Sequence, residues 1–461
     1  MRTINRRQLL RGIAATSVLA PTLARGQRRP FLTSDVGRLR TVLVHTISPN
    51  EQPVGQWDPG TLPYAETDID AASQQQQALA RLLRGSGAEV IEVADALASA
   101  IDATRGSGVF EAWVRAAFPR LASEPAKVTV DALLGRDRSQ HYRLGPDGNY
   151  RRRLTDSTST MWTRDSAFMT PQGLVICNAA TERRGRENML MRFLYRHSPM
   201  LRSYPVVFDA VEEGMIIEGG DAHVVNETTL FLGTGNRTDP RIAPVLAKRL
   251  NMDVLAVQTV EREFMRRSYV RQNDPAGELR LFTLHLDTCF THVGPRHALM
   301  LPYLFEKDYA TDGPLARFIR GARAETQMSA EDAEASLKIL KGLGTLKFYA
   351  RRTGKMTDLG ATKLADYLKA KGYRFTWTGG VRPKSDDDAF QHFMAVTYPE
   401  QRRQASNIVQ ATPNRVIAYA GNPATKAALE ADGIAVDTFG ARDLWPWHGG
   451  PHCLTQPLRR G

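Results

Sequence analysis

The 461-residue sequence contains only three cysteines, Cys177, Cys289 and Cys453, and no two of them form a CxxC pair. This scarcity excludes a zinc ribbon and a disulfide framework, because both need several closely spaced cysteines. No glycine-rich phosphate-binding fingerprint follows a strand-like segment, and "GLGT" at 342–345 is too weak a pattern to be one. Beyond residues 1–24, no stretch is long and apolar enough to span a bilayer. Each cysteine is therefore a single residue whose role depends on its neighbours.

Positive charge is in excess, with 61 lysines and arginines against 49 acidic residues and a formal net charge of +12. Such a charge attracts acidic surfaces. However, the basic clusters, such as "YRRRL" at 150–154 and "RRGR" at 183–186, are short and scattered, and no nucleic-acid motif frames them. We therefore expect them to be solvated surface and expect no nucleic-acid partner.

The first residues have the pattern of a signal peptide. Basic residues precede a modestly apolar run at 12–24, which ends in small side chains and is too short to span a membrane. Arg6 and Arg7 stand just before "QLL", which is the twin-arginine form. The alternative is a basic disordered arm. The pattern predicts a twin-arginine signal peptide over 1–24, a periplasmic or secreted protein, and no stable membrane insertion after export.

Strand-like and helix-like segments alternate over 25–461. A buried strand is expected at 37–45, and 70–93 reads as an amphipathic helix followed by a strand. Short helices over about 94–150 interrupt the alternation, which resumes from 173 onward. Interleaved strands and helices predict an α/β fold. We expect one such domain, with the interrupting block as an inserted small helical subdomain.

Three polar segments carry the candidate chemistry. "MWTRDSAF" places Asp165 in a turn before a strand, and "IIEGGDAHVV" places Glu218 and Asp221 around a Gly-Gly turn. In "FTLHLDTCF", His285 and Asp287 have the spacing of a strand, which predicts that both project from one face. Each segment alone also has an ordinary structural explanation, such as a capped turn, a hairpin or a core histidine.

Together these residues suggest the chemistry of a planar cation. Carboxylates pair with the edges of a guanidinium through bidentate hydrogen bonds. The thiolate of Cys453, in "HGGPHCLTQPLRR", can attack the electron-poor central carbon, while His285 protonates the leaving amine and later takes a proton from water. Glu218 would hold that imidazole and keep it charged, and a cation beside the thiol would stabilise the thiolate. A divalent metal on the His-x-Asp motif is the alternative, but it leaves the cysteine unexplained. We expect no metal and no cofactor.

A series of motifs occurs in a fixed order along the chain: "GRLRTVLVH", the helical block, "TRD", "ERRGRE", "EGGD", "GNRTD", "HLDT" and "GGPHC…PLRR". As a set they resemble the arginine deiminase family of guanidine-modifying enzymes. The resemblance implies a pseudo-symmetric α/β propeller of ββαβ repeats with the site at its centre. It also implies hydrolysis of a guanidinium to a ureido product of the citrulline type plus ammonia, through a covalent thiouronium-type intermediate on Cys453.

The resemblance also implies residue roles. Asp165 and Asp287 clamp the guanidinium, His285 is the acid–base, and Glu218 is its partner and a further guanidinium contact. Asp221 would lie near the amino end of the substrate, and Arg184 and Arg237 would hold a carboxylate. Trp162 would be an aromatic partner of the guanidinium.

The sequence departs from the family pattern at residues that would contact the amino-acid end of the substrate. The family usually has arginine where this chain has His448, and asparagine where it has Ser159; "TRDP" is "TRDS" and "MTCP" is "LTQP". The reaction type is therefore expected more firmly than free arginine as the substrate.

Three functions remain open at this stage: a hydrolase of arginine or an arginine-like compound, an amidinotransferase in which an amine resolves the intermediate, and a guanidine-binding protein without turnover. Release of ammonia without an added amine separates the first from the second, and a thiol of low pKa would argue against the third. In each case the partner is a small guanidino compound, and a homo-oligomer is compatible with the sequence.

Overall fold

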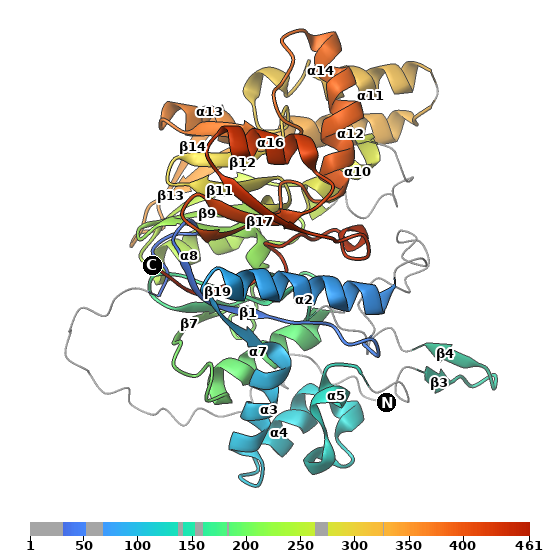
Figure 1. Cartoon of the computed structure of the whole chain (residues 1–461), viewed down its shortest axis with the longest axis vertical. Helices are drawn as coiled ribbons and strands as arrows, with labels where there is room; N and C mark the ends of the chain where they lie inside the picture. The colour runs from blue at the N-terminus through green and yellow to red at the C-terminus, as the bar shows by residue number, and fades with distance from the viewer. Residues whose placement is uncertain are drawn as a thin grey trace.

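The computed structural model describes the following residues: 31–51, 68–136, 142–152, 160–181, 184–262, 275–325 and 327–461. Helices and strands alternate through them, and the predicted α/β class is confirmed (Figure 1). The predicted signal peptide and Ser159 lie outside the described residues. Within those residues, a search for a helix with the length and apolarity of a membrane span finds none.

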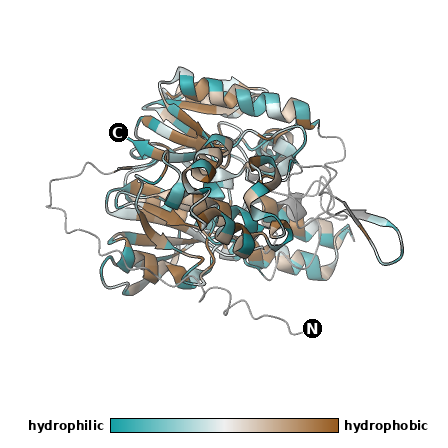
Figure 2. Cartoon of the chain, turned by 90° about the horizontal axis from the view of Figure 1, so that it is seen from below, coloured by the Kyte–Doolittle hydropathy of each residue, from teal (hydrophilic) through white to brown (hydrophobic). Residues whose placement is uncertain are grey.

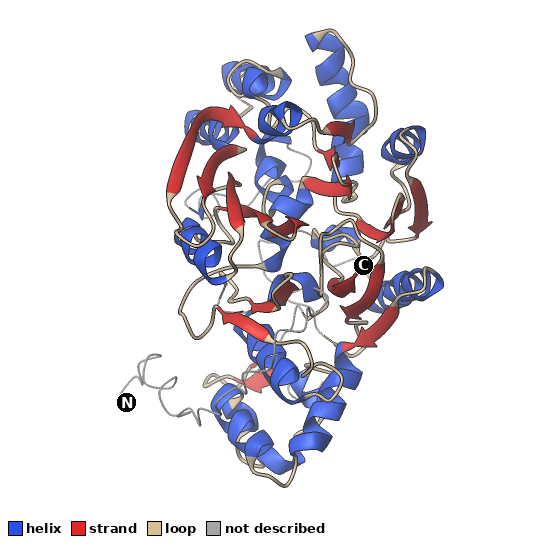
Figure 3. Ribbon diagram, turned by 90° about the vertical axis from the view of Figure 1, so that its left-hand side faces the viewer, coloured by secondary structure: helices blue, strands red, loops and turns tan. Residues whose placement is uncertain are grey.

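Five small sheets are built on one plan. In each, a first strand pairs antiparallel with a second, and the second pairs parallel with a third. In order, the strands are β19 (Gln456–Arg460), β1 (Leu39–Val44) and β2 (Glu89–Glu92); β5 (Ala167–Met169), β6 (Leu174–Ile176) and β7 (Val206–Asp209); β8 (Ala222–Asn226), β9 (Thr229–Thr234) and β10 (Asp253–Gln258); β11 (Phe290–Gly294), β12 (His297–Met300) and β15 (Arg374–Trp377); β16 (Val409–Thr412), β17 (Arg415–Tyr419) and β18 (Ala435–Phe439). Figure 3 shows these strands as separate short groups flanked by helices.

A helix joins the second strand of each unit to the third, as a parallel pair requires. These helices are α2 (Ile69–Gly85), α7 (Gly185–His197), α8 (Ala243–Arg249), α13 (Leu364–Ala370) and α16 (Pro423–Ala431). The chain therefore repeats a ββαβ unit. The first unit is completed by β19, which brings the last described strand beside the first.

The sequence of α2 explains its position. Asp68 caps the helix by accepting hydrogen bonds from the backbone N–H groups of Asp70 and Ala71. Its buried residues recur at helical spacing, from Ala72 to Leu83, so one face packs on the core and the other is solvated. Figure 2 shows the same division, with helices that carry both hydrophilic and hydrophobic residues and strands that are mostly hydrophobic.

The fourth unit carries a long insertion between β12 and β15. It contains α11 (Pro314–Ala324) and α12 (Ala330–Gly342). It also contains β13 (Thr345–Tyr349) and β14 (Met356–Lys363), which extend the β8–β9–β10 sheet beyond β10. The insertion thus links two neighbouring units.

A second group of helices lies between β2 and β5, where the sequence predicts an inserted subdomain. It comprises α3 (Val93–Thr104), α4 (Val109–Ala117), α5 (Val130–Leu133) and the hairpin β3 (Tyr142–Leu144)–β4 (Tyr150–Arg152). The helices lie at the opposite end of the molecule from α11 and α12 (Figure 1). Trp113 of α4 stacks on Phe193 of α7, with ring centroids 4.0 Å apart. The group therefore supports α7, whose first turn reaches the site described below.

Candidate active site

Each of the five units contributes a side chain from the turn just ahead of its first strand. Asp165 lies in the one-turn helix α6 (Thr163–Ser166) before β5, and Glu218 precedes β8. Asp287 precedes β11, Asn407 precedes β16 and Cys453 precedes β19. All five are buried. Because the units repeat one plan, equivalent turns meet in one place.

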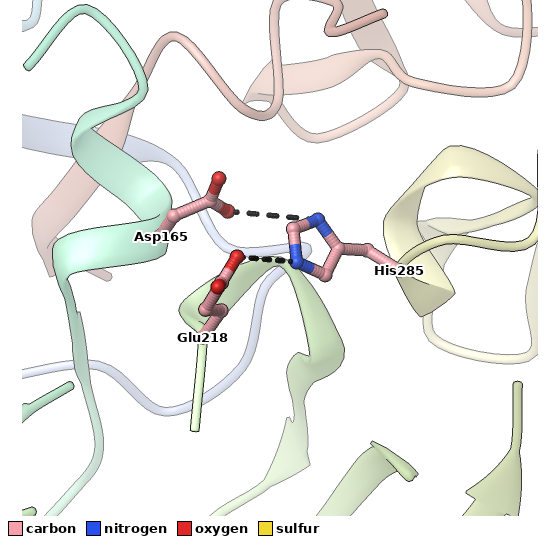
Figure 4. A group of neighbouring side chains, drawn as sticks. All are labelled: Asp165, Glu218 and His285. Atoms are coloured by element: carbon pink, nitrogen blue, oxygen red, sulfur yellow. Dashed lines mark hydrogen bonds and ion pairs between the residues drawn. The ribbon is translucent and has the colours of Figure 1, made fainter. Parts of the chain in front are cut away.

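His285 forms the charged centre of the site (Figure 4). Its Nε2 donates to Glu218 Oε2 at 2.9 Å, and its Nδ1 lies 3.8 Å from Asp165 Oδ1. Burial by itself lowers the pKa of an imidazole, but Asp165 and the hydrogen bond to Glu218 outweigh it and raise the pKa of His285 to about 9. The ring is therefore protonated at neutral pH. The expected pairing of His285 with Glu218 is present in the structure.

The strand spacing expected for His285 and Asp287 is wrong. The chain forms a short 3-10 helix over Leu286–Thr288, because Asp221 Oδ1 accepts a hydrogen bond from the Leu286 backbone N–H at 2.9 Å and pins the turn. His285 and Asp287 still reach the site, but toward different partners: Glu218 for the imidazole and Cys453 for the carboxyl group.

The thiol of Cys453 has two hydrogen-bond partners among the described residues. Its Sγ–H points at Asp287 Oδ2, 3.2 Å away, and Asn407 Nδ2 donates to Sγ at 3.0 Å. Burial, and then the charges of Asp287 and Asp165, raise the pKa of the thiol well above its usual value. Among the described residues, no cationic side chain is a hydrogen-bond partner of Sγ, so the expected cation beside the thiol is not found among these partners.

Two carboxylate oxygens are left open. Within the described part of the chain, Asp165 Oδ1 and Asp287 Oδ1 are buried and have no hydrogen-bond partner. Buried polar atoms are almost always paired, so such a set indicates a place for a ligand with several N–H donors. Burial, followed by the charge of Asp165, raises the pKa of Asp287 to about 7. A bound cation would therefore be stabilised here and would in turn favour the ionised carboxylates.

Asp221 is used inside the protein. Its Oδ2 accepts from Thr238 Oγ1 at 2.7 Å, and its Oδ1 holds Leu286 as described above. Burial raises its pKa to about 6. The structure thus places Asp221 as a link between the two turns that carry Glu218 and His285.

The two arginines expected to hold a substrate carboxylate contact the carboxylates of the site instead. Arg184 Nη1 donates to Asp165 Oδ2 at 2.9 Å and to Glu218 Oε2 at 3.0 Å. Arg237 Nη1 lies 3.3 and 3.4 Å from the two oxygens of Glu218. Burial works against ionisation of Glu218, but Arg237, Arg184 and His285 hold its pKa well below the usual range.

The turn before Cys453 packs on Trp162. A Cβ on Gly449 would lie 2.2 Å from Trp162 Cζ3, so only glycine allows this contact. His448 has a left-handed backbone (φ 59°), and burial together with the charge of Arg402 lowers its pKa to about 4. At neutral pH, His448 therefore carries no charge. Trp162 and His448 both border the cysteine turn.

A sequence model of the family described as "Arginine deiminase" matches residues 123–460. The chain belongs to the arginine deiminase family. A putative arginine deiminase of Mycoplasma pneumoniae is 24% identical over an alignment of 446 positions, which covers 93% of this chain and 97% of that protein. An arginine deiminase of Mycolicibacterium gilvum is 26% identical over an alignment of 451 positions, which covers 93% of this chain and 97% of the relative.

Among solved structures, unliganded AgrE matches with a TM-score of 0.47 and 15% identity, over 91% of this chain and 39% of AgrE. The product-bound N-terminal domain of the arginine dihydrolase ArgZ matches with a TM-score of 0.46 and 13% identity, over 91% and 97% of the two chains. As a member of the arginine deiminase family, the protein is a guanidino-group hydrolase that works through a cysteine intermediate.

Sequence reasoning missed Asn407. Its Oδ1 accepts from the backbone N–H groups of Gly450 and Cys453, at 3.0 and 3.1 Å, while its Nδ2 contacts the thiol. The signal was present in the repeat: Asn407 occupies the turn before β16 that corresponds to the turns of the four other units. A search for polar residues before each first strand would have found it.

The metal alternative can be compared with this deiminase site. The ligand atoms of Asp165, Glu218 and His285 lie within 4.8 Å of one another, which is close enough to share an ion. A divalent ion there would have to remove the proton from His285 and displace Arg184 from both carboxylates. The arrangement suits a guanidinium better, because one already occupies it.

Proposed function

We propose that the protein is an exported deiminase that converts arginine or an arginine-like guanidino compound to the ureido product and ammonia, with Cys453 as the nucleophile. The observation that carries this proposal is the contact of Cys453 Sγ with Asp287 Oδ2 at 3.2 Å, next to two buried carboxylate oxygens that lack hydrogen-bond partners in the described residues. A guanidinium held by Asp165 and Asp287 brings its central carbon to the thiol.

The substrate itself prepares the nucleophile. The charges of Asp287 and Asp165 favour the protonated thiol. A guanidinium between them neutralises these charges, which removes two causes of the raised pKa and favours the thiolate. The proton leaves toward Asp287, the acceptor 3.2 Å from the sulfur, and passes on to water, because the bound guanidinium favours the ionised carboxylate.

The reaction then has two halves. The Cys453 thiolate forms a C–S bond to the guanidinium carbon, His285 gives its proton to the departing nitrogen, and the C–N bond breaks to release ammonia. Neutral His285 next takes a proton from water as the water oxygen attacks the same carbon. The C–S bond breaks and the sulfur leaves as the thiolate. The thiolate then takes the remaining hydroxyl proton, which restores the thiol and releases the neutral ureido product. A pKa of about 9 makes His285 the acid of the first half, and Glu218 stabilises its charged form.

The test is a set of guanidino compounds incubated with the purified enzyme, with detection of both ureido product and ammonia. Cys453→Ser should fold normally and lose turnover, because a hydroxyl attacks far more weakly than a thiolate. A serine variant that keeps more than a trace of activity would exclude Cys453 as the nucleophile. Ammonia release only in the presence of an added amine would indicate the amidinotransferase, and a tightly bound compound without product would indicate a binding protein.

Two further proposals concern architecture and location. The five ββαβ units are arranged as a pseudo-symmetric propeller around the site, which is supported by the contribution of one turn from every unit. The twin-arginine pattern of residues 1–24 supports export of the folded enzyme to the periplasm or beyond. A change of Arg6 and Arg7 to lysine should retain the enzyme in the cytoplasm, and unaltered export would contradict this proposal.

A further inference from the structure

Arg184 pairs with two carboxylates of the site. One nitrogen of its guanidinium, Nη1, donates to both Asp165 and Glu218, at 2.9 and 3.0 Å. The side chain is 8% exposed, and those of Asp165 and Glu218 are 6% and 0% exposed. The protein thus places its own guanidinium on one carboxylate of the clamp, Asp165, and on Glu218, the further guanidinium contact that the family resemblance implies.

We propose that Arg184 is an internal stand-in for the substrate guanidinium, which leaves Asp165 and Glu218 only when a substrate guanidinium replaces it, and that this exchange determines which cations the site accepts. The inference rests on the proposed function, since it concerns the same carboxylates.

The remaining contacts of Arg184 allow such an exchange. Its Nε and Nη2 donate to Glu187 Oε2, at 3.1 and 2.8 Å, from the first turn of α7. Glu187 therefore holds the side chain by one edge while Nη1 alone reaches Asp165 and Glu218. A rotation of the guanidinium that frees Nη1 can keep the pair with Glu187. The packing of Trp113 on Phe193 fixes α7 and so fixes the position of this pivot.

The exchange is selective because of the geometry of a guanidinium. A planar fork of N–H donors can pair with two carboxylates at once, whereas an ammonium is a compact point charge. A guanidinium or amidinium substrate can replace the hydrogen bonds of Arg184 Nη1 with one nitrogen and reach Asp287 with another, which the single nitrogen of a simple amine cannot do. The displaced Nη1 is then a free donor beside the substrate, where it can meet an anionic group. Arginine would bind more tightly through both the exchange and the contact of its carboxylate with Nη1, whereas a guanidine without a carboxylate would benefit only from the exchange.

Arg237 provides a matched control. It also contacts Glu218, at 3.3 and 3.4 Å, but no described contact joins it to Asp165, and its side chain is 17% exposed. Removal of either arginine takes one positive charge from the neighbourhood of Glu218. Only removal of Arg184 also frees Asp165, one of the two clamp carboxylates, so the two variants separate occupancy of Asp165 from the general electrostatic field.

The experiment measures alkylation of Cys453 by 2-chloroacetamidine, a small cationic amidine, and by neutral iodoacetamide, in the wild type, Arg184→Met and Arg237→Met. In Arg184→Met, we expect the second-order rate with the amidine to rise by about tenfold or more, as the loss of charged hydrogen bonds implies. The rate in Arg237→Met should change much less, and the iodoacetamide rates should differ little among the three proteins. Free guanidinium ion should protect the thiol of Arg184→Met at a lower concentration than that of the wild type.

Arg184→Lys serves as the second variant if Arg184→Met unfolds, which circular dichroism and thermal melting will show. Lysine keeps the charge but lacks the fork, so its amidine rate should lie between those of the wild type and Arg184→Met. Equal amidine rates in the Arg184 and Arg237 variants would overturn the inference, as would a raised KM for arginine in Arg184→Met with an unchanged amidine rate. Cys453 that reacts with the amidine in no variant would instead count against the proposed function.

Discussion

The contact between Gly449 and Trp162 gives a direct test of the cysteine turn. In Gly449→Ala, the new Cβ would lie 2.2 Å from Trp162 Cζ3 and 2.5 Å from Cη2. Favourable carbon–carbon contacts begin near ~3.5 Å, so the ring or the turn must move by about 1 Å or more. Gly449 is not among the positive-φ glycines, so the backbone itself tolerates alanine. Overpacking of this kind costs about 1–3 kcal/mol of stability.

The effect on activity should be larger than the effect on stability. The turn that carries Gly449 leads directly to Cys453, and Asn407 Oδ1 ties Gly450 and Cys453 together. A shift of the turn is therefore passed to the nucleophile. A misplacement of about 1 Å in a reacting group can reduce the rate by about 10²-fold. We expect a loss of that order in kcat/KM, with a modest decrease in Tm.

The assay is ammonia release, together with thermal unfolding, and Gly440→Ala is the control. A Cβ on Gly440 meets no heavy atom within 4 Å, and its backbone is also not in the left-handed region. Gly440→Ala should therefore behave as the wild type. Adding Trp162→Phe to Gly449→Ala should restore stability, because the smaller ring removes atoms that the methyl group meets. Wild-type kcat/KM and Tm in Gly449→Ala would refute this account of the turn.

Three further predictions concern titration and specificity. The pKa of His285 is raised to about 9, so the stabilisation from its charge is complete below the ordinary imidazole pKa of about 6.5 and is lost as the pH rises through 9. Urea unfolding of the wild type and of His285→Ala should therefore show a difference in the free energy of unfolding that falls by roughly 3 kcal/mol across this pH range. The pKa of Asp287 is raised to about 7, so the cost of its buried charge grows between pH 4 and 7; Asp287→Asn should raise Tm at pH 8 but not at pH 4, and should lose catalysis and weaken substrate saturation. An unchanged KM in Asp287→Asn would contradict its part in the clamp. His448→Arg should raise kcat/KM for arginine, because the buried imidazole is neutral at pH 7; no change, with arginine already the best substrate, would contradict an altered carboxylate pocket.

The fold class and most of the site residues could be predicted from the sequence, because alternating apolar strands and amphipathic helices are local patterns. Contacts between distant turns are not local, and there the predictions were incomplete. The sequence separation of His285 and Asp287 is compatible with a strand and with a 3-10 turn. The hydrogen bond from the Leu286 backbone N–H to Asp221, which is distant in sequence, favours the turn. The strands β13 and β14 join the sheet of another unit, which no local pattern indicates.

The electrostatic predictions also depended on distant contacts. A cation was expected beside Cys453 because a thiolate needs one, whereas the described neighbours are Asp287 and Asn407. The cations are gathered around Glu218 instead, where Arg184 and Arg237 meet it. Residue types alone show that positive and negative groups are present, but only the fold shows which of them are paired before a substrate binds.

The pairing of β19 with β1 has a consequence for the order in which the enzyme matures. Cys453 and β19 follow every other site residue in the sequence, and β19 closes the unit that β1 and β2 begin. During synthesis the ribosome therefore releases the clamp, the acid–base pair and Asn407 before the nucleophile. A nascent chain that stops before Cys453 lacks the nucleophile of the proposed reaction. Chemical competence arrives together with the strand that joins the two ends of the fold, so an incomplete chain is inert toward cellular arginine.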